Sequence, residues 1–502
     1  MQYQSTRDDK IRLQASQVIA RGISEEGGLF VPEALPDLRG ELSNLSKLNY
    51  SALAKRIFSF FLTDFSQEEI SACVEEAYSP EKFDGEEPVK LVPLTKSGKK
   101  KYLLELWHGP TCAFKDMALQ ILPHFLTKSM GKALPGKEAV ILTATSGDTG
   151  KAALEGFRDV PGTRILVFYP ENGVSQMQKR QMETQEGENV KVCAIKGNFD
   201  DAQNTVKRVF TDPAMKAELA AHSMVFSSAN SINFGRLLPQ IIYYFYAYFS
   251  LCRTGALRLG EPFHVAVPTG NFGNILAAFY AFQMGLPVGK FICASNANRV
   301  LTDFIRTGVY DRRREFFTTI SPSMDILISS NLERLLFALS GENSAALAQW
   351  MRQLSETGCY QVTPEVLQKM QELFFGGYCD DQQTSSTIRR VWETEGYLCD
   401  PHTAVALEVY GQYLAETGDS DTPTVIASTA SPFKFPESVL AALGKTVPED
   451  GFEAMEALQS VSGVKLPEQL KALREKPIRF QETIAPEQAD EFIRASAGKG
   501  EC

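Results

Sequence analysis

The chain has 502 residues, of which 44% are hydrophobic and 22% charged, and its formal net charge is −10. These values are ordinary for a globular protein of roughly two to four domains, and the acidic balance argues against nucleic acid as a partner. Nine scattered cysteines, none in a Cys-x-x-Cys spacing, and five histidines without a paired motif disfavour a disulfide framework and a metal site.

The amino terminus lacks the apolar core of a signal peptide, and the longest apolar run, 237–251, is too short to span a bilayer. We therefore expect a cytoplasmic protein that acts on a small molecule and has no membrane or nucleic-acid partner, as a monomer or a homodimer.

Residues 1–95 are predicted to form a mostly helical lobe, because apolar residues recur with helical spacing over 16–23, 51–65 and 67–77. A short strand is expected over 89–94, just before the predicted boundary.

Residues 96–298 alternate between strand and helix patterns. Strands are expected over 102–107, 139–143, 164–169, 190–195 and 263–267, with helices over 117–130, 149–157, 175–185, 200–210 and 231–252. Such alternation predicts an α/β fold, a parallel sheet covered by helices on both faces.

Residues 299–420 are predicted to be a helical insertion. Helices are expected over 324–339, 364–375 and 385–415, with a loop at Gly376-Gly377. Residues 421–502 return to the sheet through a strand at 424–427 and a helix at 437–443, and a polar, wrapping tail is expected from about 446.

The most informative stretch is HGPTCAFKD, residues 108–116, between a strand and a helix. Lys115 is placed at the helix start, next to Ala113 and Phe114. Poor solvation and the positive end of a helix both disfavour its ammonium form. Such an amine is suited to a Schiff base with a carbonyl cofactor, although a lone lysine of this kind is more often a surface residue.

Two further stretches follow strands and open helices. TATSGDTG, 143–150, offers hydroxyls and glycines that suit either an anion site or a helix cap by Ser146 or Asp148. PTGNFGN, 268–274, lets a backbone approach a phosphate. It lacks the Gly-x-Gly-x-x-Gly spacing of a dinucleotide site, so a monophosphate fits it better.

Two weaker clusters complete the set. SANSINFGR, 228–236, crowds amides and hydroxyls at the start of an apolar helix, where Arg236 suits either a carboxylate or phosphate ligand or a surface ion pair. STASPFKF, 428–435, ends the returning strand with hydroxyls that suit either a ligand or a helix cap. Together, a reactive lysine, a monophosphate loop, a second anion site and a neutral hydroxyl suggest pyridoxal phosphate.

These motifs resemble the threonine synthase family of fold-type II pyridoxal-phosphate enzymes, in its longer microbial and fungal form. The resemblance also includes residues 14–32, with Gly27-Gly28-Leu29-Phe30, and the stretch DPHTAVA at 400–406. It implies a fold like that of the tryptophan synthase β subunit. Ser431 and Phe433 depart from the family pattern, which has histidine and alanine there, so any role of Ser431 at the substrate is in doubt.

Carried over by position, the resemblance makes Lys115 the catalytic Schiff-base lysine and assigns no metal ligand. The cofactor-binding residues would be Lys115, Asp148, Gly270, Asn271, Phe272, Gly273, Asn274 and Thr429, with Thr429 at the pyridine nitrogen. The substrate-binding residues would be Thr145, Ser146, Gly147, Thr149, Ser231, Asn233 and Arg236.

The implied activity is that of a carbon–oxygen lyase, converting O-phospho-L-homoserine and water to L-threonine and phosphate. Lys115, displaced by the substrate amine, would then act as the base. Two alternatives stay open on the residues alone. One is a dehydratase or lyase that gives a 2-keto acid and ammonia, and the other is a non-catalytic ligand-binding relative.

Overall fold

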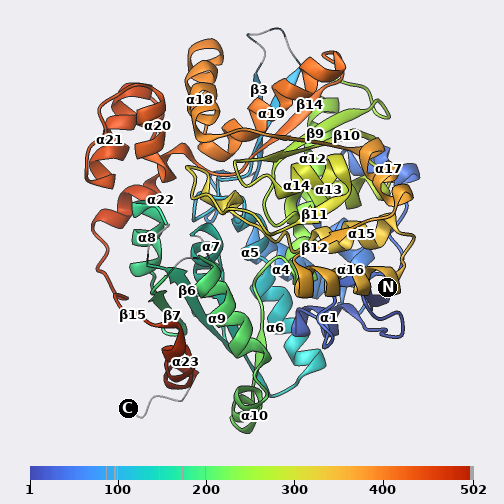
Figure 1. The fold of residues 1–502 in the computed structure, drawn as a ribbon, viewed down its shortest axis with the longest axis vertical. Coiled ribbons are helices and arrows are strands. Elements are labelled where there is room, and N and C mark those ends of the chain that lie inside the picture. The colour runs from blue at the N-terminus through green and yellow to red at the C-terminus, as the bar shows by residue number, and fades with distance from the viewer. Residues whose placement is uncertain are drawn as a thin grey trace.

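The computed structural model describes the chain except residues 86, 95, 97, 99, 146, 172–173, 198 and 498–502, and except the side chains of 199, 200 and 497. Within this part, two large sheets built mainly of parallel strands are covered by helices (Figure 1). The predicted α/β class is confirmed. No described helix is long and apolar enough to cross a membrane.

The larger sheet has the strand order β13-β10-β9-β14-β4-β3. All neighbours are parallel except β3, which runs antiparallel to β4. Its strands are β3 (Lys90–Leu94), β4 (Lys101–Glu105), β9 (Phe263–Pro268), β10 (Val288–Ser295), β13 (Phe374–Tyr378) and β14 (Thr424–Ser428). The late strand β14 therefore lies in the middle of the sheet, between β4 and β9.

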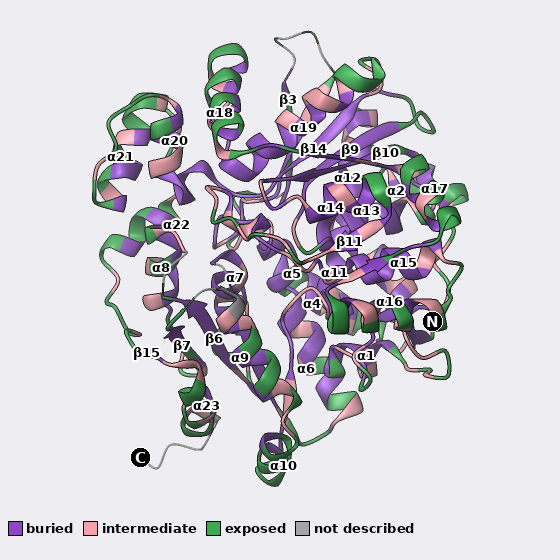
Figure 2. Ribbon diagram, in the orientation of Figure 1, coloured by how far each residue is buried: buried purple, intermediate pink, exposed green. Residues whose placement is uncertain are grey.

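The two faces of this sheet are buried against different helices, as the alternation of strand residues requires. Val265 and Val425 belong to the core that includes α12 (Pro239–Arg253) and α13 (Gly273–Gln283). Ala266 and Ile426 face the core that includes α18 (Asp381–Glu395) and α19 (Pro401–Thr417). The central strands β9 and β14 are buried along their whole length, as Figure 2 shows.

The smaller sheet has the order β15-β7-β6-β5-β8, and all its strands are parallel. Its strands are β5 (Glu138–Ala144), β6 (Thr163–Pro170), β7 (Val190–Ile195), β8 (Met224–Ser227) and β15 (Thr483–Ile484). One face packs on α7 (Asp148–Phe157), and the other on α9 (Phe199–Thr211) and α23 (Ala489–Ala497). The short strands β8 and β15 were not predicted.

The amino-terminal lobe contains the three predicted helices. They are α1 (Ala15–Arg21), α3 (Tyr50–Phe61) and α4 (Gln67–Ala77). The strands β1 (Tyr3–Ser5) and β2 (Phe30–Pro32), which lie on either side of α1 in the chain, pair in a two-stranded sheet. A capping box between Ser66 and Glu69 fixes the start of α4. The lobe packs on the main body through α1 against α6 (Leu122–Ala133) and through α3 against α12.

The structure corrects the predictions for the region 299–420 at four places. The single helix expected over 385–415 is interrupted at residues 396–400, where Gly396 ends α18 in the left-handed conformation and α19 begins only at Pro401. Helix α17 (Pro364–Leu373) ends early, and Gly376 and Gly377 lie in β13 rather than in a loop. Glycine is required there because a Cβ on Gly376 would lie 3.2 Å from the Thr302 backbone, and one on Gly377 would lie 2.6 Å from Val409. The helix expected over 324–339 is restricted to α15 (Leu332–Leu339), and residues 325–331 are irregular.

Four helices begin shortly after strands and direct their first turns to one region. They are α5 (Asp116–Leu119), α7, α11 (Phe234–Leu237) and α13, which follow β4, β5, β8 and β9. This arrangement collects the predicted motifs at the carboxyl ends of both sheets, where open α/β sheets bind their ligands.

The helix predicted over 437–443 is α20 (Pro436–Ala442), whereas the tail from about 446 is more ordered than predicted, with α21 (Gly451–Ser462), β15 and α23. It starts beside the larger sheet, and its strand β15 joins the smaller one (Figure 1).

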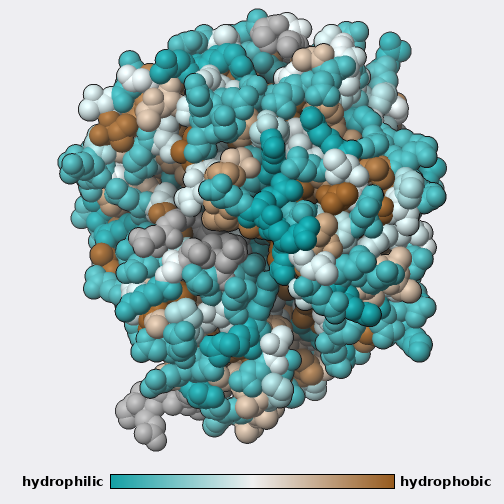
Figure 3. Space-filling model, in the orientation of Figure 1, coloured by the Kyte–Doolittle hydropathy of each residue, from teal (hydrophilic) through white to brown (hydrophobic). Residues whose placement is uncertain are grey.

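The surface in Figure 3 is mostly hydrophilic, with scattered hydrophobic side chains. The remaining helices are α2 (Leu42–Leu45), α8 (Gln176–Glu183), α10 (Pro213–Ala221), α14 (Val300–Thr307), α16 (Ser344–Thr357) and α22 (Glu468–Lys471), and β11 (Val309–Asp311) pairs with β12 (Cys359–Gln361).

Candidate active site

A cavity of about 560 Å³ opens at the carboxyl ends of β9 and β14, a volume typical of a small-molecule site. All five predicted motifs contribute to its wall. The predicted site residues that line it are Lys115, Thr145, Thr149, Ser231, Arg236, Gly270, Asn271, Phe272, Gly273, Asn274 and Thr429.

Lys115 immediately precedes α5 and is only 8% exposed. Its Nζ lies 5.0 Å from the centre of the Phe114 ring, 3.4 Å from Oγ of Ser323 and 3.8 Å from Oδ2 of Asp148. Burial lowers the pKa of this amine to about 8, against the opposing attraction of Asp148. A lysine that loses its proton this readily can act as a nucleophile and as a base.

The loop from Gly270 to Asn274 has the form of an anion cradle. In the described part of the chain, its backbone N–H groups donate to no protein acceptor. Its carbonyl groups are engaged, because Ser329 Oγ donates to the Gly270 carbonyl at 2.7 Å and the Asn331 N–H donates to the Asn271 carbonyl at 3.1 Å. Free N–H groups at a helix start bind phosphate well.

Two details of this loop support that interpretation. Phe272 has a positive φ of 62°, an uncommon conformation for a large residue that is often associated with ligand sites. Oδ1 of Asn274 accepts from the Tyr243 and Tyr244 hydroxyls at 2.7 and 2.5 Å, and the buried Nδ2 has no partner among the described residues. A buried donor of this kind indicates a ligand acceptor.

The stretch 145–149 has mixed roles. Thr145 and Thr149 line the cavity, whereas Gly147 is not among the lining residues. Oγ1 of Thr145 accepts from the N–H groups of Gly147 and Gly150 at 2.9 and 2.8 Å, so it also shapes the turn. Asp148 begins α7 and faces Lys115. Ser146 lies outside the described residues.

Arg236 is a buried guanidinium without a described carboxylate partner. It is 5% exposed, its Nη1 donates to the Ala229 carbonyl at 2.7 Å, and its Nε has no partner in the part of the chain that the structure describes. Burial lowers its pKa to about 10. A guanidinium in the cavity wall, with an N–H group available at Nε, suits an anionic ligand.

Asn233, predicted to bind substrate, is not among the residues that line the cavity. Its Oδ1 accepts from the Gly235 N–H at 2.9 Å and caps α11, and its Nδ2 donates to the Ile19 and Ser228 carbonyls. All its polar groups therefore hold the helix start, and we omit Asn233 from the binding residues proposed below.

Thr429 follows β14 and is 5% exposed in the cavity wall. Its carbonyl accepts from the Phe114 N–H at 2.8 Å, which ties the lysine segment to the sheet. Ser431, at the departure from the family pattern, caps the turn η3 (Pro432–Lys434) by accepting from the Phe433 N–H. It is buried and is not among the lining residues, so its contacts here are structural.

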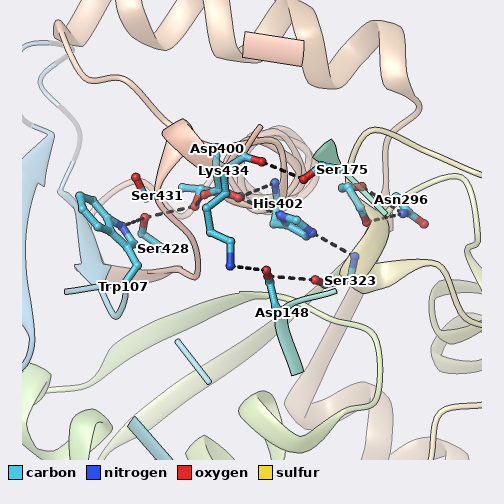
Figure 4. A network of polar contacts seen from close by, with 12 residues as sticks. Trp107, Asp148, Ser175, Asn296, Ser323, Asp400, His402, Ser428, Ser431 and Lys434 are labelled. Atoms are coloured by element: carbon cyan, nitrogen blue, oxygen red, sulfur yellow. Dashed lines mark hydrogen bonds and ion pairs between the residues drawn. The ribbon is translucent and has the colours of Figure 1, made fainter. Parts of the chain in front are cut away.

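Sequence reasoning missed Ser323, His402 and Lys434, which join the site through a buried polar network (Figure 4). The Ser323 N–H donates to Nε2 of His402 at 3.1 Å, so Nδ1 carries the proton that contacts Asp400 at 2.9 Å. The sequence signals for them were the stretch 400–406, which contains His402, and the stretch 428–435, which contains Lys434. Nothing local indicated that His402 would hold the segment at 323.

The sequence matches three family profiles along its length. Residues 2–78 match the family described as "Threonine synthase N terminus", 83–429 match "Pyridoxal-phosphate dependent enzyme", and 403–493 match "Threonine synthase, C-terminal". The second match includes all the predicted site residues that line the cavity.

Individual proteins show the same relation. Threonine synthase-like 1 of Macaca fascicularis is 39% identical over 439 residues, a match that covers 85% of this chain and 58% of that protein. Threonine synthase of Pseudomonas aeruginosa is 39% identical, with 88% of this chain and 90% of that protein covered. The solved structure of pyridoxal-phosphate-bound threonine synthase from Brucella melitensis is 34% identical, has a TM-score of 0.86, and covers 99% of this chain and 100% of its own.

Proposed function

Because this chain belongs to the threonine synthase family of fold-type II pyridoxal-phosphate enzymes, we propose that it converts O-phospho-L-homoserine and water to L-threonine and phosphate. The activity and substrate are proposals, since the chain spans little more than half the length of the mammalian relatives that it matches. We also propose a cytoplasmic location and a monomer or homodimer.

The observation that carries this proposal is that one cavity is lined by a lysine of lowered pKa and by two groups suited to anions. The first group is the row of N–H groups at Gly270–Asn274, which donate to no acceptor among the described residues, and the second is the guanidinium of Arg236, which has no carboxylate partner among them. A cofactor phosphate needs one of them, and a substrate that carries its own anionic groups needs the other. Both sites and Lys115 line one cavity.

The residues present fit pyridoxal phosphate. Lys115 would hold its aldehyde, the free N–H groups and Nδ2 of Asn274 its phosphate, and Thr429 its ring nitrogen. When bound, the cofactor supplies an electron sink beside the substrate's α-carbon.

The chain's own residues supply binding and proton transfer. Arg236 would fix the substrate through its phosphate or carboxylate, and the buried walls would limit the access of water. Nζ of Lys115, once freed by the substrate amine, would accept the α-proton, and a pKa of about 8 suits both uptake and release. Thr145 and Thr149 offer hydroxyls on the same wall.

The test is product analysis. The purified protein should carry the cofactor and convert phosphohomoserine to threonine and phosphate in equal amounts. A dehydratase would instead yield a 2-keto acid and ammonia as the main products, and a ligand-binding relative would yield neither.

A Gly270→Ala variant should lose the cofactor more easily. The added Cβ would lie 2.8 Å from the Ser323 carbonyl oxygen and 3.3 Å from the Met324 Cα, so the loop must shift and its N–H groups move away from the phosphate. We expect affinity for pyridoxal phosphate to fall about tenfold or more, as one lost hydrogen bond would cause. Cofactor content after dialysis measures this, and Gly411→Ala, which meets nothing within 4 Å, is the matched control.

A Thr429→Val variant should fold normally and lose activity. Valine keeps the shape of the side chain, and the backbone contact with Phe114 does not need the hydroxyl. We expect a loss of about tenfold in turnover, the value of one neutral hydrogen bond, together with a changed pH dependence of the cofactor absorbance. An unaltered spectrum and rate would restrict Thr429 to a structural role.

A further inference from the structure

Lys434 is a fully buried lysine to which neither the motif analysis nor the proposed mechanism gives a role. It is 0% exposed and lies in η3, just after β14. Its Nζ is 2.6 Å from Oδ1 of Asp148 and donates to the Thr111 carbonyl at 3.1 Å. Figure 4 shows its side chain extended toward Asp148.

Asp148 is shared between two lysines, but unequally. Oδ1 contacts Lys434 and accepts from Nε2 of Gln178 at 2.9 Å. Oδ2 accepts from Ser323 Oγ at 3.3 Å and lies 3.8 Å from Nζ of Lys115. Because the attraction between charges falls with distance, the ion pair with Lys434 is the dominant one.

We propose that Lys434 is a positioning residue whose buried ammonium neutralises Asp148, so that Lys115 has no carboxylate counter-ion of its own. This role rests on the proposed function, in which Lys115 must shed a proton to hold the cofactor and to act as a base. In this proposal Lys434 contacts neither the cofactor nor the substrate, and it acts on Lys115 through Asp148.

The groups around Lys115 make the sign of the effect clear. Asp148 on α7 and Asp116 on α5 favour the ammonium form, whereas Arg236 on α11 and Lys434 in η3 disfavour it. His402 is a further titratable residue in the wall of the cavity that contains Lys115. Without Lys434, the charge of Asp148 would act on Lys115 alone and hold its proton.

A purely structural role explains Lys434 less well. Burying a lysine and an aspartate together carries a desolvation penalty, and a packed apolar pair of similar volume is often as stable or more stable. The ion pair of Lys434 and Asp148 is therefore better explained by its effect on the charge next to the Lys115 amine.

The experiment measures the protonation of Lys115 in the full chain after removal of the cofactor. Lys115 is labelled with acetic anhydride between pH 6 and 11, in competition with a free reference amine, and its peptide is quantified by mass spectrometry. The variants are Lys434→Met, Asp148→Asn and the double variant.

Lys434→Met should move the labelling midpoint of Lys115 upward by about 1 to 3 pH units. Asp148→Asn should move it downward. The double variant should lie between Asp148→Asn and the wild type, because Asp148 acts on Lys115 more strongly than Lys434 does. The rate at which pyridoxal phosphate attaches to Lys115, followed by absorbance against pH, should shift in the same directions.

An unchanged or lower midpoint in Lys434→Met would overturn the proposal. If that variant does not fold, Asp148→Asn is compared with the double variant, in which no buried carboxylate is left unpaired, and an equal midpoint in the two would overturn it. A lower melting temperature with no change in midpoint would mean a structural role only. None of these readouts requires threonine formation, so failure of the proposed function would be seen separately, in the products of the wild type.

Discussion

A Lys115→Ala variant should lose at least about 10³-fold in turnover, since both the attachment point for the cofactor and the base are removed. The fold should persist. Among the described residues, the polar contacts of the Lys115 side chain are long, 3.4 Å to Ser323 and 3.8 Å to Asp148, and Asp148 keeps its partner Lys434. Steady-state kinetics, the absorbance of the lysine-bound cofactor and the melting temperature together test this.

Lys151 provides the matched control for Lys115. It is also a buried lysine, 6% exposed, but its ammonium pairs with Glu155 at 3.0 Å and donates to Gln185, and it does not line the cavity. Lys151→Met should lower the melting temperature while the cofactor absorbance remains. A Lys115→Ala variant with normal turnover and colour would contradict the assignment of Lys115.

Arg236→Met should weaken the use of phosphohomoserine by about one to two orders of magnitude in kcat/KM. The variant keeps a flexible side chain but loses a charge-assisted hydrogen bond of about 1.5–3 kcal/mol. Binding of unphosphorylated serine, followed by the change in cofactor absorbance, should be affected much less if Arg236 holds the substrate phosphate.

Arg236→Lys is the control, because it restores a positive charge without the two-pronged donor geometry and should recover part of the loss. Equal losses on phosphohomoserine and serine would assign Arg236 to the carboxylate that both share. No loss on either would remove it from the substrate site.

The sequence predicted the parts of this site that depend on local pattern. Strands such as β5 and β9 are short apolar runs that end in glycine and hydroxyl residues, so the loops at Thr145 and Gly270 could be placed at strand ends before any contact was known. The resemblance to a family then gave those loops roles. Asn233 shows the limit of this reasoning, since an amide at a helix start has the same local pattern whether it caps or binds.

What the sequence could not show depends on contacts between distant segments. Lys434 and Asp148 lie far apart in the chain, and neither motif indicates the other. Residues 325–331 have helical apolar spacing, yet Ser329 and Asn331 hydrogen-bond to the Gly270 and Asn271 carbonyls, and the segment is irregular. Here tertiary hydrogen bonds override local propensity.

The central place of β14 has a consequence for synthesis of the chain. Until residues 424–428 leave the ribosome, β4 and β9 lack the strand that pairs with both of them, and each exposes an open edge suited to non-native pairing. The larger sheet, and with it the position of Thr429, is therefore completed only after most of the protein has been made. A nascent chain stopped at residue 420 would be prone to aggregation and would depend on chaperones.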